Sequence, residues 1–439
     1  MGVPRQMHFI GFCIAGPNWH HNGSWRHDES DAVDALDPKR YENIARILEE
    51  GKFDGLFFVD VLTLFDTFGK SFAANLRQPG QIFLLEPLQL LSRMAAVTQH
   101  LGLAATMSTA FYHPFHIARA FASLDHISGG RAAWNVVTSA NDREAQNFGM
   151  DKLMERGLRY DHAEEVIEAC QALWNSWDED ALILDRKNGV YADPDKVHYV
   201  NFEGKWVKTR GPLQTPRSPQ TSPVLMQAGS SERGREFAGR WAEVLFTLQH
   251  DKAEMQAFYA DIKSRLDKNG RPPNHCAVLP AIDIIVGETE SIAKEKAAYL
   301  NSLVSPELGV AEISNAMGVD LSGYPLDKPL VDMEINQGSR GVFDNILKGS
   351  EKKNLTLREA GQHFGISELT PQLIGTPEMI ADHMQDLFES EACDGFVIVP
   401  SLTPSGYAQF VKSVVPELQR RGIYRKDYTG RTFRENLRS

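Results

Sequence analysis

The sequence lacks the features of a disulfide-stabilised, zinc-bound or membrane-spanning protein. Its 439 residues include four cysteines that lie far apart and form no CxxC pair, so we expect neither a disulfide framework nor a structural zinc site. No run of 18 apolar residues is present, and the N-terminus MGVPRQMHFIGF has no basic-then-apolar signal organisation. These absences predict a cytoplasmic protein.

A surplus of positive charge is also absent. The chain has 46 Lys and Arg against 58 Asp and Glu, a formal net charge of −12, which argues against nucleic acid or an anionic membrane as a partner. With 42% hydrophobic residues, the chain is long enough for one large domain with insertions or for two domains.

A dinucleotide fingerprint is missing as well, because no GxGxxG follows the first apolar segment. What is present is a repeat, clearest in residues 123–149. An apolar helix ends at Gly129 and Gly130, where glycine supplies the positive φ of a helix C-cap. A short apolar run at 132–137 then fits a buried strand and ends in polar residues. This is one βα unit with polar side chains at its carboxyl end.

Eight such strands alternate with helices along the chain. The predicted strands are 7–14, 55–59, 101–108, 132–137, 224–227, 244–248, 277–286 and 395–399. The predicted helices begin at Pro38 and Thr376 or span 87–98, 116–128, 160–174, 231–242, 253–268, 291–303 and 407–421. Eight parallel strands with intervening helices predict an α/β fold, a (β/α)₈ TIM barrel formed by residues 1–439 as a single domain.

Two segments interrupt the alternation and are predicted to be insertions over the carboxyl-terminal face of the barrel. Residues 177–217 suggest hairpins, with Asp193-Pro194 and Glu203-Gly204 as turns, and residues 304–373 are irregular. Aromatic residues in the two insertions would suit lids that exclude water: Trp177, Tyr191, Tyr199, Phe202, Trp206 and Phe343.

Polar residues at the predicted strand ends are the candidates for chemistry, because the carboxyl ends of barrel strands carry the active site. The segment that most specifically indicates a binding site is QAGSSERG, residues 227–234. There a strand end leads through Ser230 and Ser231 into the start of a helix. Backbone N–H groups and serine hydroxyls there could hold a phosphate. A plain Ser N-cap explains the same residues equally well.

Several blocks resemble the flavin-dependent monooxygenases of the bacterial luciferase superfamily. They are LDHISGGRAAWNVVTS, NFG with RYDHAEE, QAGSSERGREFA and VVPELQRRGIYRKDYTGRTFREN. The resemblance is closest to the branch of nitrilotriacetate, dibenzothiophene-sulfone and long-chain alkane monooxygenases, and it runs almost end to end. It implies a (β/α)₈ barrel, reduced FMN supplied by a separate NAD(P)H-dependent flavin reductase, and insertion of one oxygen atom from O₂ into a small organic substrate. A homodimer or homotetramer is also implied.

The resemblance implies cofactor contacts for several residues, each with a structural alternative. Asp60 matches an acidic residue beside the flavin, or it caps the next segment. Thr106 matches a threonine at the flavin ring, or it only packs in its strand. Tyr160 matches the tyrosine of the RYD motif, or it packs at a helix start, and Ser230 and Ser231 match the phosphate site. Asn135 belongs to the polar end of the fourth strand, which is expected to form a wall of the flavin pocket.

Departures from the family pattern leave the acid–base group and the substrate open. Arg156 stands where relatives carry a flavin-contacting histidine; arginine can bind phosphate but cannot shuttle a proton. Ala140 stands where the alkane-oxidising relative carries a further histidine. The remaining candidates for proton transfer are His20, His21 and His113. His20 and His21 with His27 could also suggest a metal site, but their spacing is irregular and no metal is expected.

Three functions remain in competition. The first is a two-component FMN monooxygenase, and aromatic residues in the loops favour an apolar or aromatic substrate such as a sulfone, heterocycle or amine. The second is a deazaflavin-dependent dehydrogenase of the same fold. The third is a flavin-binding protein without catalytic activity, in which the missing histidines would signal lost chemistry.

Overall fold

The computed structural model describes residues 5–329 and 355–439, so Phe343 lies outside the described residues. Eight parallel strands form a closed barrel. In sheet order they are β1 (His8–Ile14), β2 (Gly55–Val59), β3 (Gly102–Ser108), β4 (Ala132–Val137), β9 (Val224–Ala228), β10 (Val244–Thr247), β11 (Ala277–Val286) and β13 (Gly395–Ile398). The pairings β10 with β11 and β13 with β1 close the ring. The predicted TIM barrel is therefore confirmed, with all eight strands close to their expected positions.

Aromatic side chains fill the barrel interior towards its carboxyl end. The rings of Phe12 and Phe57 lie 5.4 Å apart, and Phe246 lies 5.8 Å from Phe57 and 6.5 Å from Phe12. Because alternate residues of a barrel strand point inward, one such ring from each of three strands gives a continuous apolar floor under the barrel mouth.

Helices surround the strands as the sequence predicted. Asp37 accepts a hydrogen bond from the Lys39 N–H at the start of α1, and Gly129 ends α4 with φ of 70°. No helix of the described residues is long and apolar enough to cross a bilayer. The surrounding helices are α1 (Pro38–Glu50), α3 (Pro87–Ala95), α4 (Pro114–Ser128), α6 (Arg156–Trp174), α7 (Glu232–Trp241), α8 (Lys252–Lys268), α9 (Glu290–Ser302), α13 (Pro377–Glu389), α14 (Ser405–Gln409) and α15 (Val415–Arg420).

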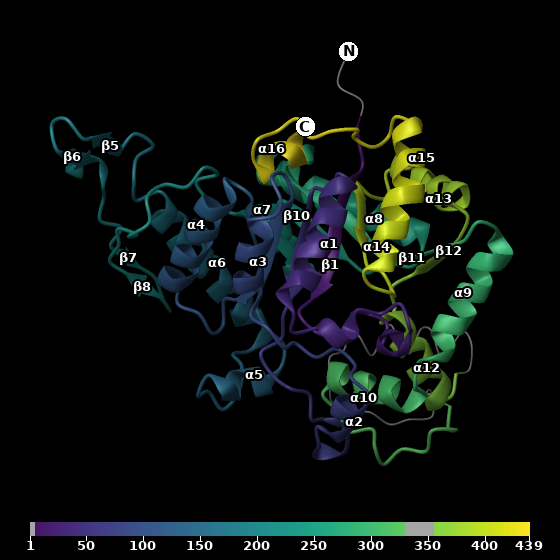
Figure 1. Cartoon of the computed structure of the whole chain (residues 1–439). Coiled ribbons are helices and arrows are strands. Elements are labelled where there is room, and N and C mark those ends of the chain that lie inside the picture. The colour runs from purple at the N-terminus through teal and green to yellow at the C-terminus, as the bar shows by residue number, and fades with distance from the viewer. Residues whose placement is uncertain (1–4, 330–354) are drawn as a thin grey trace.

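The first insertion differs from its expected position over the barrel mouth. It contains the hairpin of β5 (Leu182–Asp185) and β6 (Val190–Ala192) and the hairpin of β7 (Phe202–Glu203) and β8 (Lys208–Thr209). It runs along the outside of α4 and α6, because the Glu165 carboxylate on α6 accepts hydrogen bonds from three consecutive backbone N–H groups, those of residues 205–207. Figure 1 shows both hairpins at the flank of the barrel.

The turns of the first insertion were predicted in part. Glu203-Gly204 does connect β7 and β8. Asp193 instead caps η4 (Pro194–Lys196) by accepting a hydrogen bond from the Asp195 N–H, since proline at the first helical position favours helix entry. The turn between β5 and β6 lies at Asn188-Gly189, where Gly189 has φ of 71°.

The second insertion lies at the carboxyl-terminal end of the barrel and is more regular than predicted. It contains α10 (Pro306–Met317) and α12 (Leu357–Ser367), which pack closely on one another and meet α2 (Ala73–Arg77) from the loop after β2 (Figure 1). The helices cross at glycines: a Cβ at Gly309 would lie 1.8 Å from the Gly361 carbonyl oxygen. A short ninth strand, β12 (Gln372–Gly375), follows and pairs with β11.

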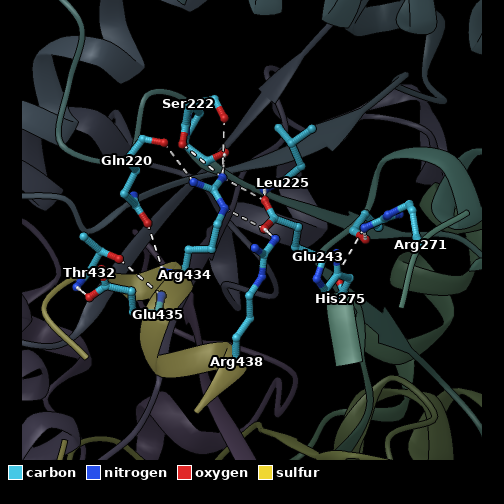
Figure 2. A network of polar contacts seen from close by, with 12 residues as sticks. Gln220, Ser222, Leu225, Glu243, Arg271, His275, Thr432, Arg434, Glu435 and Arg438 are labelled. Carbon is cyan, nitrogen blue, oxygen red and sulfur yellow. Dashed lines mark hydrogen bonds and ion pairs between the residues drawn. The ribbon is translucent and has the colours of Figure 1, made fainter. Parts of the chain in front are cut away.

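The C-terminal helix α16 (Phe433–Arg438) closes the opposite, amino-terminal end of the barrel. The Phe433 ring fills the space beside Gly55 and Gly102. Arg434 forms an ion pair with the Glu243 carboxylate at 2.7 Å and donates to the Gln220 carbonyl oxygen at 3.0 Å (Figure 2). The carboxyl-terminal face, at the other end of the barrel, is therefore the one at which we look for the site.

Candidate active site

Two of the predicted cofactor residues meet at the ends of β3 and β4. Thr106 and Asn135 are paired in the strand register, and both are buried. The Thr106 hydroxyl donates to the Phe58 carbonyl oxygen at 2.7 Å and accepts from the Asn135 side-chain amide, also at 2.7 Å. The pair fixes the direction of the Asn135 amide at the barrel mouth. Thr106 therefore does more than pack in its strand.

Asp60, at the end of β2, lies in a group of carboxylates. Burial, together with the nearby Glu86 and Glu144 carboxylates, raises the pKa of Asp60 to about 7. Glu144 accepts from the Leu62 N–H at 3.2 Å, and Glu86 caps α3. The next helical turn after Asp60 begins only at residue 68, so Asp60 is not a helix cap. Its pKa therefore lies well above that of an ordinary aspartate.

The predicted phosphate segment forms the start of α7. Ser231 is the N-cap, and its hydroxyl accepts the Gly234 N–H at 3.2 Å, so the capping role is present. The same hydroxyl retains its own proton for a ligand. The Tyr160 hydroxyl lies against this turn, only 2.9 Å from where a Cβ on Gly234 would stand, and Ser230 is exposed beside it. Tyr160, Ser230 and Ser231 are thus brought together.

Arg159, three residues after the predicted Arg156 on the same helix, is anchored beside the end of β4. Arg156 is exposed at the first position of α6. Arg159, one turn later, is half-buried; its guanidinium donates to the Ser139 carbonyl oxygen, and its Nε has no hydrogen-bond partner among the described residues. Burial lowers the pKa of Arg159. The signal was available, since Arg159 precedes Tyr160 within the quoted RYD motif.

His20 and His21 are buried and link the loop after β1 to the second insertion and to α9, respectively. His20 Nδ1 lies 2.8 Å from the Thr370 hydroxyl, and the His20 ring packs tilted against the Phe12 ring, with 4.3 Å between the ring centroids. His21 Nε2 lies 3.3 Å from Asn301 Oδ1 on α9. Burial lowers the pKa of His20 to about 3 and that of His21 to about 4, so both rings are neutral at physiological pH.

The barrel and its sequence have counterparts among known proteins. Residues 7–394 match the family model described as luciferase-like monooxygenase. The chain belongs to this family. This luciferase-like monooxygenase is 48% identical to the dibenzothiophene-sulfone monooxygenase of Rhodococcus erythropolis (strain XP), over 100% of this chain and 97% of that protein. The family expected from the motifs is therefore confirmed.

Solved structures agree with this assignment over nearly the whole chain. The luciferase-like monooxygenase superposes on long-chain alkane monooxygenase with a TM-score of 0.88 and 38% identity, covering 99% of this chain and 96% of that one. Riboflavin lyase, solved with modified FMN and riboflavin, gives a TM-score of 0.89 and 31% identity, with 99% and 96% covered. The chain is thus an oxidoreductase of a family that uses flavin.

His113 is the predicted catalytic residue that lies apart from the others. It is exposed, it caps α4 by accepting the Phe115 N–H at 3.2 Å, and its Nε2 lies 3.0 Å from the Lys208 carbonyl oxygen. One ring nitrogen of this residue therefore caps α4, and the other holds the first insertion against the barrel. No group of three His, Cys, Asp or Glu side chains in the described part of the chain is arranged to bind a metal.

Sequence reasoning missed a polar group at the ends of β11 and β13. Asp283 is buried, accepts from the Ser401 N–H at 2.9 Å and from Gln372 Nε2 at 2.8 Å, and has its pKa raised by burial. Asn301 in turn donates to Gln372 at 3.1 Å. One carboxylate within the otherwise apolar run AVLPAIDIIV was the available signal, because a buried charge requires partners.

Proposed function

We propose that the chain is the oxygenase component of a two-component system, which uses reduced FMN from a separate NAD(P)H-dependent flavin reductase and inserts one atom of O₂ into a neutral organic substrate. One observation carries the proposal: neighbouring strands of the barrel place two sets of side chains at the same mouth. The first set, Thr106 and Asn135, can form hydrogen bonds to the flavin ring. The second set surrounds the turn that starts α7 and can bind an anion: Ser231, Tyr160 and Arg159.

The residues fit the phosphate of FMN. Arg159 has a buried Nε without a partner among the described residues, which a phosphate oxygen would satisfy. The first backbone N–H groups of α7 and the hydroxyl of Ser231 supply further donors. Gly229 and Gly234 leave room for the Tyr160 hydroxyl, since a Cβ at Gly234 would approach it to 2.9 Å. Ser230 is exposed at the same turn and completes the proposed phosphate site.

The residues at the strand ends fit the ring of the cofactor. Reduced flavin supplies the electrons that activate O₂, and the protein supplies orientation, a dry site and proton transfer. Asn135, held by Thr106, would orient the ring by its side-chain amide. The floor under the mouth excludes water from below. Asp60 holds or releases a proton at its carboxyl group near neutral pH, and His20 would act as a neutral hydrogen-bonding group.

The charge at the mouth supports a neutral apolar or aromatic substrate, such as an aryl sulfone or N-heterocycle. The carboxylates of Asp60, Glu86 and Glu144 gather on one side, and His20 carries no charge at neutral pH. A polycarboxylate would be repelled there. Aromatic rings in the barrel interior favour a planar substrate through stacking.

The test combines anaerobic binding with turnover. Reduced FMN, riboflavin and a deazaflavin are titrated into the protein, and O₂ uptake with product formation is then followed with NADH, a flavin reductase and a panel of aryl sulfones, N-heterocycles, alkanes and aminopolycarboxylates. We expect binding of reduced FMN and oxygenation of an aryl sulfone or heterocycle. Preferential binding of the deazaflavin would support a dehydrogenase instead. FMN binding without any product would support a non-catalytic flavin-binding protein.

A further inference from the structure

The imidazole ring of His20 faces one short segment of the second insertion, the turn that follows α12. His20 Nδ1 lies 2.8 Å from the Thr370 hydroxyl, and His20 Nε2 lies 3.9 Å from a carboxyl oxygen of Glu368. In the described part of the chain, Glu368 has the only carboxyl group within 4.0 Å of a His20 nitrogen. These two side chains therefore set the hydrogen-bonding state of the ring.

The backbone of this turn is strained. Glu368 and Leu369 both have left-handed φ angles, 47° and 68°, which cost free energy for residues other than glycine. Glu368 is the C-cap of α12, and glycine is the residue that most often takes a left-handed conformation at a helix end. Such strain clusters at functional sites, and here it occurs in the turn that carries both side chains facing His20.

Glu368 has an acidic neighbour and no cationic one. No Lys or Arg nitrogen of the described residues lies within 4.0 Å of the carboxyl group of Glu368 or of Glu312. Glu312 on α10 is buried and accepts from Asn75 Nδ2 at 2.8 Å. Burial and the Glu312 carboxyl group raise the pKa of Glu368 well above its ordinary value. Glu368 is therefore protonated at neutral pH, and its carboxyl group is a hydrogen-bond donor.

His21, the next residue after His20, has partners that fix its tautomer. Its Nδ1 accepts from the Gly23 N–H at 3.2 Å, and its Nε2 lies 3.3 Å from Asn301 Oδ1. Because this amide oxygen is an acceptor, the proton of the neutral His21 ring is on Nε2. Neither partner titrates, so His21 is an internal reference beside His20.

We propose that Glu368 and Thr370 are positioning residues for His20, which hold its ring neutral with the proton on Nδ1. Nδ1 then donates to the Thr370 hydroxyl, because a protonated carboxyl group on the other side favours Nε2 as the acceptor. The separation of 3.9 Å exceeds a hydrogen bond, so the Nε2 lone pair stays available to a donor group of a bound ligand. The inference rests on the proposed role of His20 as a neutral group at the barrel mouth and adds that this group accepts at Nε2.

NMR of the protein labelled with ¹⁵N-histidine tests the assignment, since the two neutral tautomers and the imidazolium ion have distinct nitrogen shifts. His20→Gln and His21→Gln identify the two rings among the 14 histidines. At about pH 7 we expect the proton on Nδ1 in His20 and on Nε2 in His21. An imidazolium ion at His20, or a proton on its Nε2, would overturn the proposal. The spectrum is recorded without cofactor, so its outcome does not depend on the proposed function.

Substitutions in the turn test each positioning residue. Glu368→Gln keeps a neutral donor and should retain the wild-type His20 tautomer. Glu368→Gly suits the left-handed backbone but removes the donor, so the ratio of the two His20 tautomers should change at least about threefold. Thr370→Val removes the acceptor of the Nδ1 proton and should have a similar effect, which Thr370→Ser should reverse. The His21 shifts should remain those of wild type in all four variants, and circular dichroism establishes that each is folded.

Turnover separates positioning from a purely structural role. Thr370→Val and Glu368→Gly should lower kcat about tenfold and leave KM for the organic substrate within about threefold of wild type. Wild-type His20 shifts in Thr370→Val and Glu368→Gly would overturn the proposal, even if turnover fell. If the spectra change as expected but the wild-type chain oxygenates no substrate, the proposed function fails and the positioning of His20 stands.

Discussion

The side-chain amide of Asn135 donates to the hydroxyl of Thr106 at 2.7 Å, across the paired ends of β3 and β4. This bond connects two strands that the sequence identifies separately and gives the barrel mouth a fixed hydrogen-bonding group. Its neighbours along the mouth are Asp60 on β2 and the start of α7 after β9. Each of these groups can be tested by a substitution that changes one atom or one charge.

Loss of the Thr106 hydroxyl should weaken binding of reduced FMN. Thr106→Ala leaves the Asn135 amide without its acceptor and free to rotate, and the affinity is expected to fall about tenfold. Thr106→Ser keeps the hydroxyl and should bind within about threefold of wild type. Anaerobic titration followed by flavin absorbance measures both. Equal losses in the two variants would show that packing of the methyl group, and not the hydrogen bond, controls the site.

Arg159 and Arg156 should differ in their effect on phosphate recognition. Arg159→Gln removes the half-buried guanidinium and is expected to lower the affinity for FMN by about 10–100-fold. Riboflavin, which has no phosphate, should bind the variant as well as it binds wild type. The matched control Arg156→Gln, at an exposed position on the same helix, should change neither affinity by more than about threefold. The ratio of FMN to riboflavin affinity is the measurement. A larger loss in the Arg156 variant would reverse the assignment.

Asp60 should make the protein less stable as the pH rises. Its pKa is raised from the usual 3.8 to about 7, so between these values the folded chain binds more protons than the unfolded chain. Stability therefore falls with increasing pH over this window, and the full cost applies above pH 7. Asp60→Asn removes the cost, so the variant should be more stable than wild type by about 2–4 kcal/mol at about pH 8.

The same two proteins should have equal stability below about pH 4, where the wild-type carboxyl is protonated in both states. Urea unfolding at several pH values measures the difference. Asp267→Asn on the exposed face of α8 is the control for a general effect of removing one negative charge. A difference between Asp60→Asn and wild type that stays constant with pH would show that the carboxyl group does not titrate in this window.

Removal of Arg434 should destabilise the amino-terminal closure of the barrel. Glu243 is buried, and hydrogen bonds and charge from Arg434 keep its pKa low despite that burial. Arg434→Met leaves this carboxylate with Arg438 at 3.0 Å and the Leu225 N–H at 3.3 Å, and is expected to cost about 3–5 kcal/mol of unfolding free energy. Adding Glu243→Gln removes the unpaired charge and should recover part of the loss. Thermal and urea unfolding measure both, and additive losses in the double variant would contradict the coupling.

The sequence by itself determined the barrel. Apolar runs such as GLFFV and AAWNVV are buried on both sides of the sheet, so they are recognisable without knowledge of their neighbours. Helix boundaries were equally local: Asp37 before Pro38 and the glycines after α4 act within one turn. Polar residues at strand ends followed directly, and Asp60, Asn135 and the α7 start were located in this way, whereas Thr106 was implied by the family resemblance.

Tertiary structure decided which of these residues face one another and which are buried. The rotation of α6, fixed by its packing, turns Arg159 toward the mouth and leaves Arg156 exposed, three residues apart on the same helix. His20 and His21 are buried where the second insertion and α9 meet the loop after β1, through contacts about 350 residues away for His20 and 280 for His21. Which side chains are buried, and which point toward one another, depends on such long-range contacts. No local sequence pattern could therefore have predicted either property. For the same reason the first insertion lies along α4 and α6 and not over the barrel mouth, since the direction in which an insertion folds is set by its partners in space.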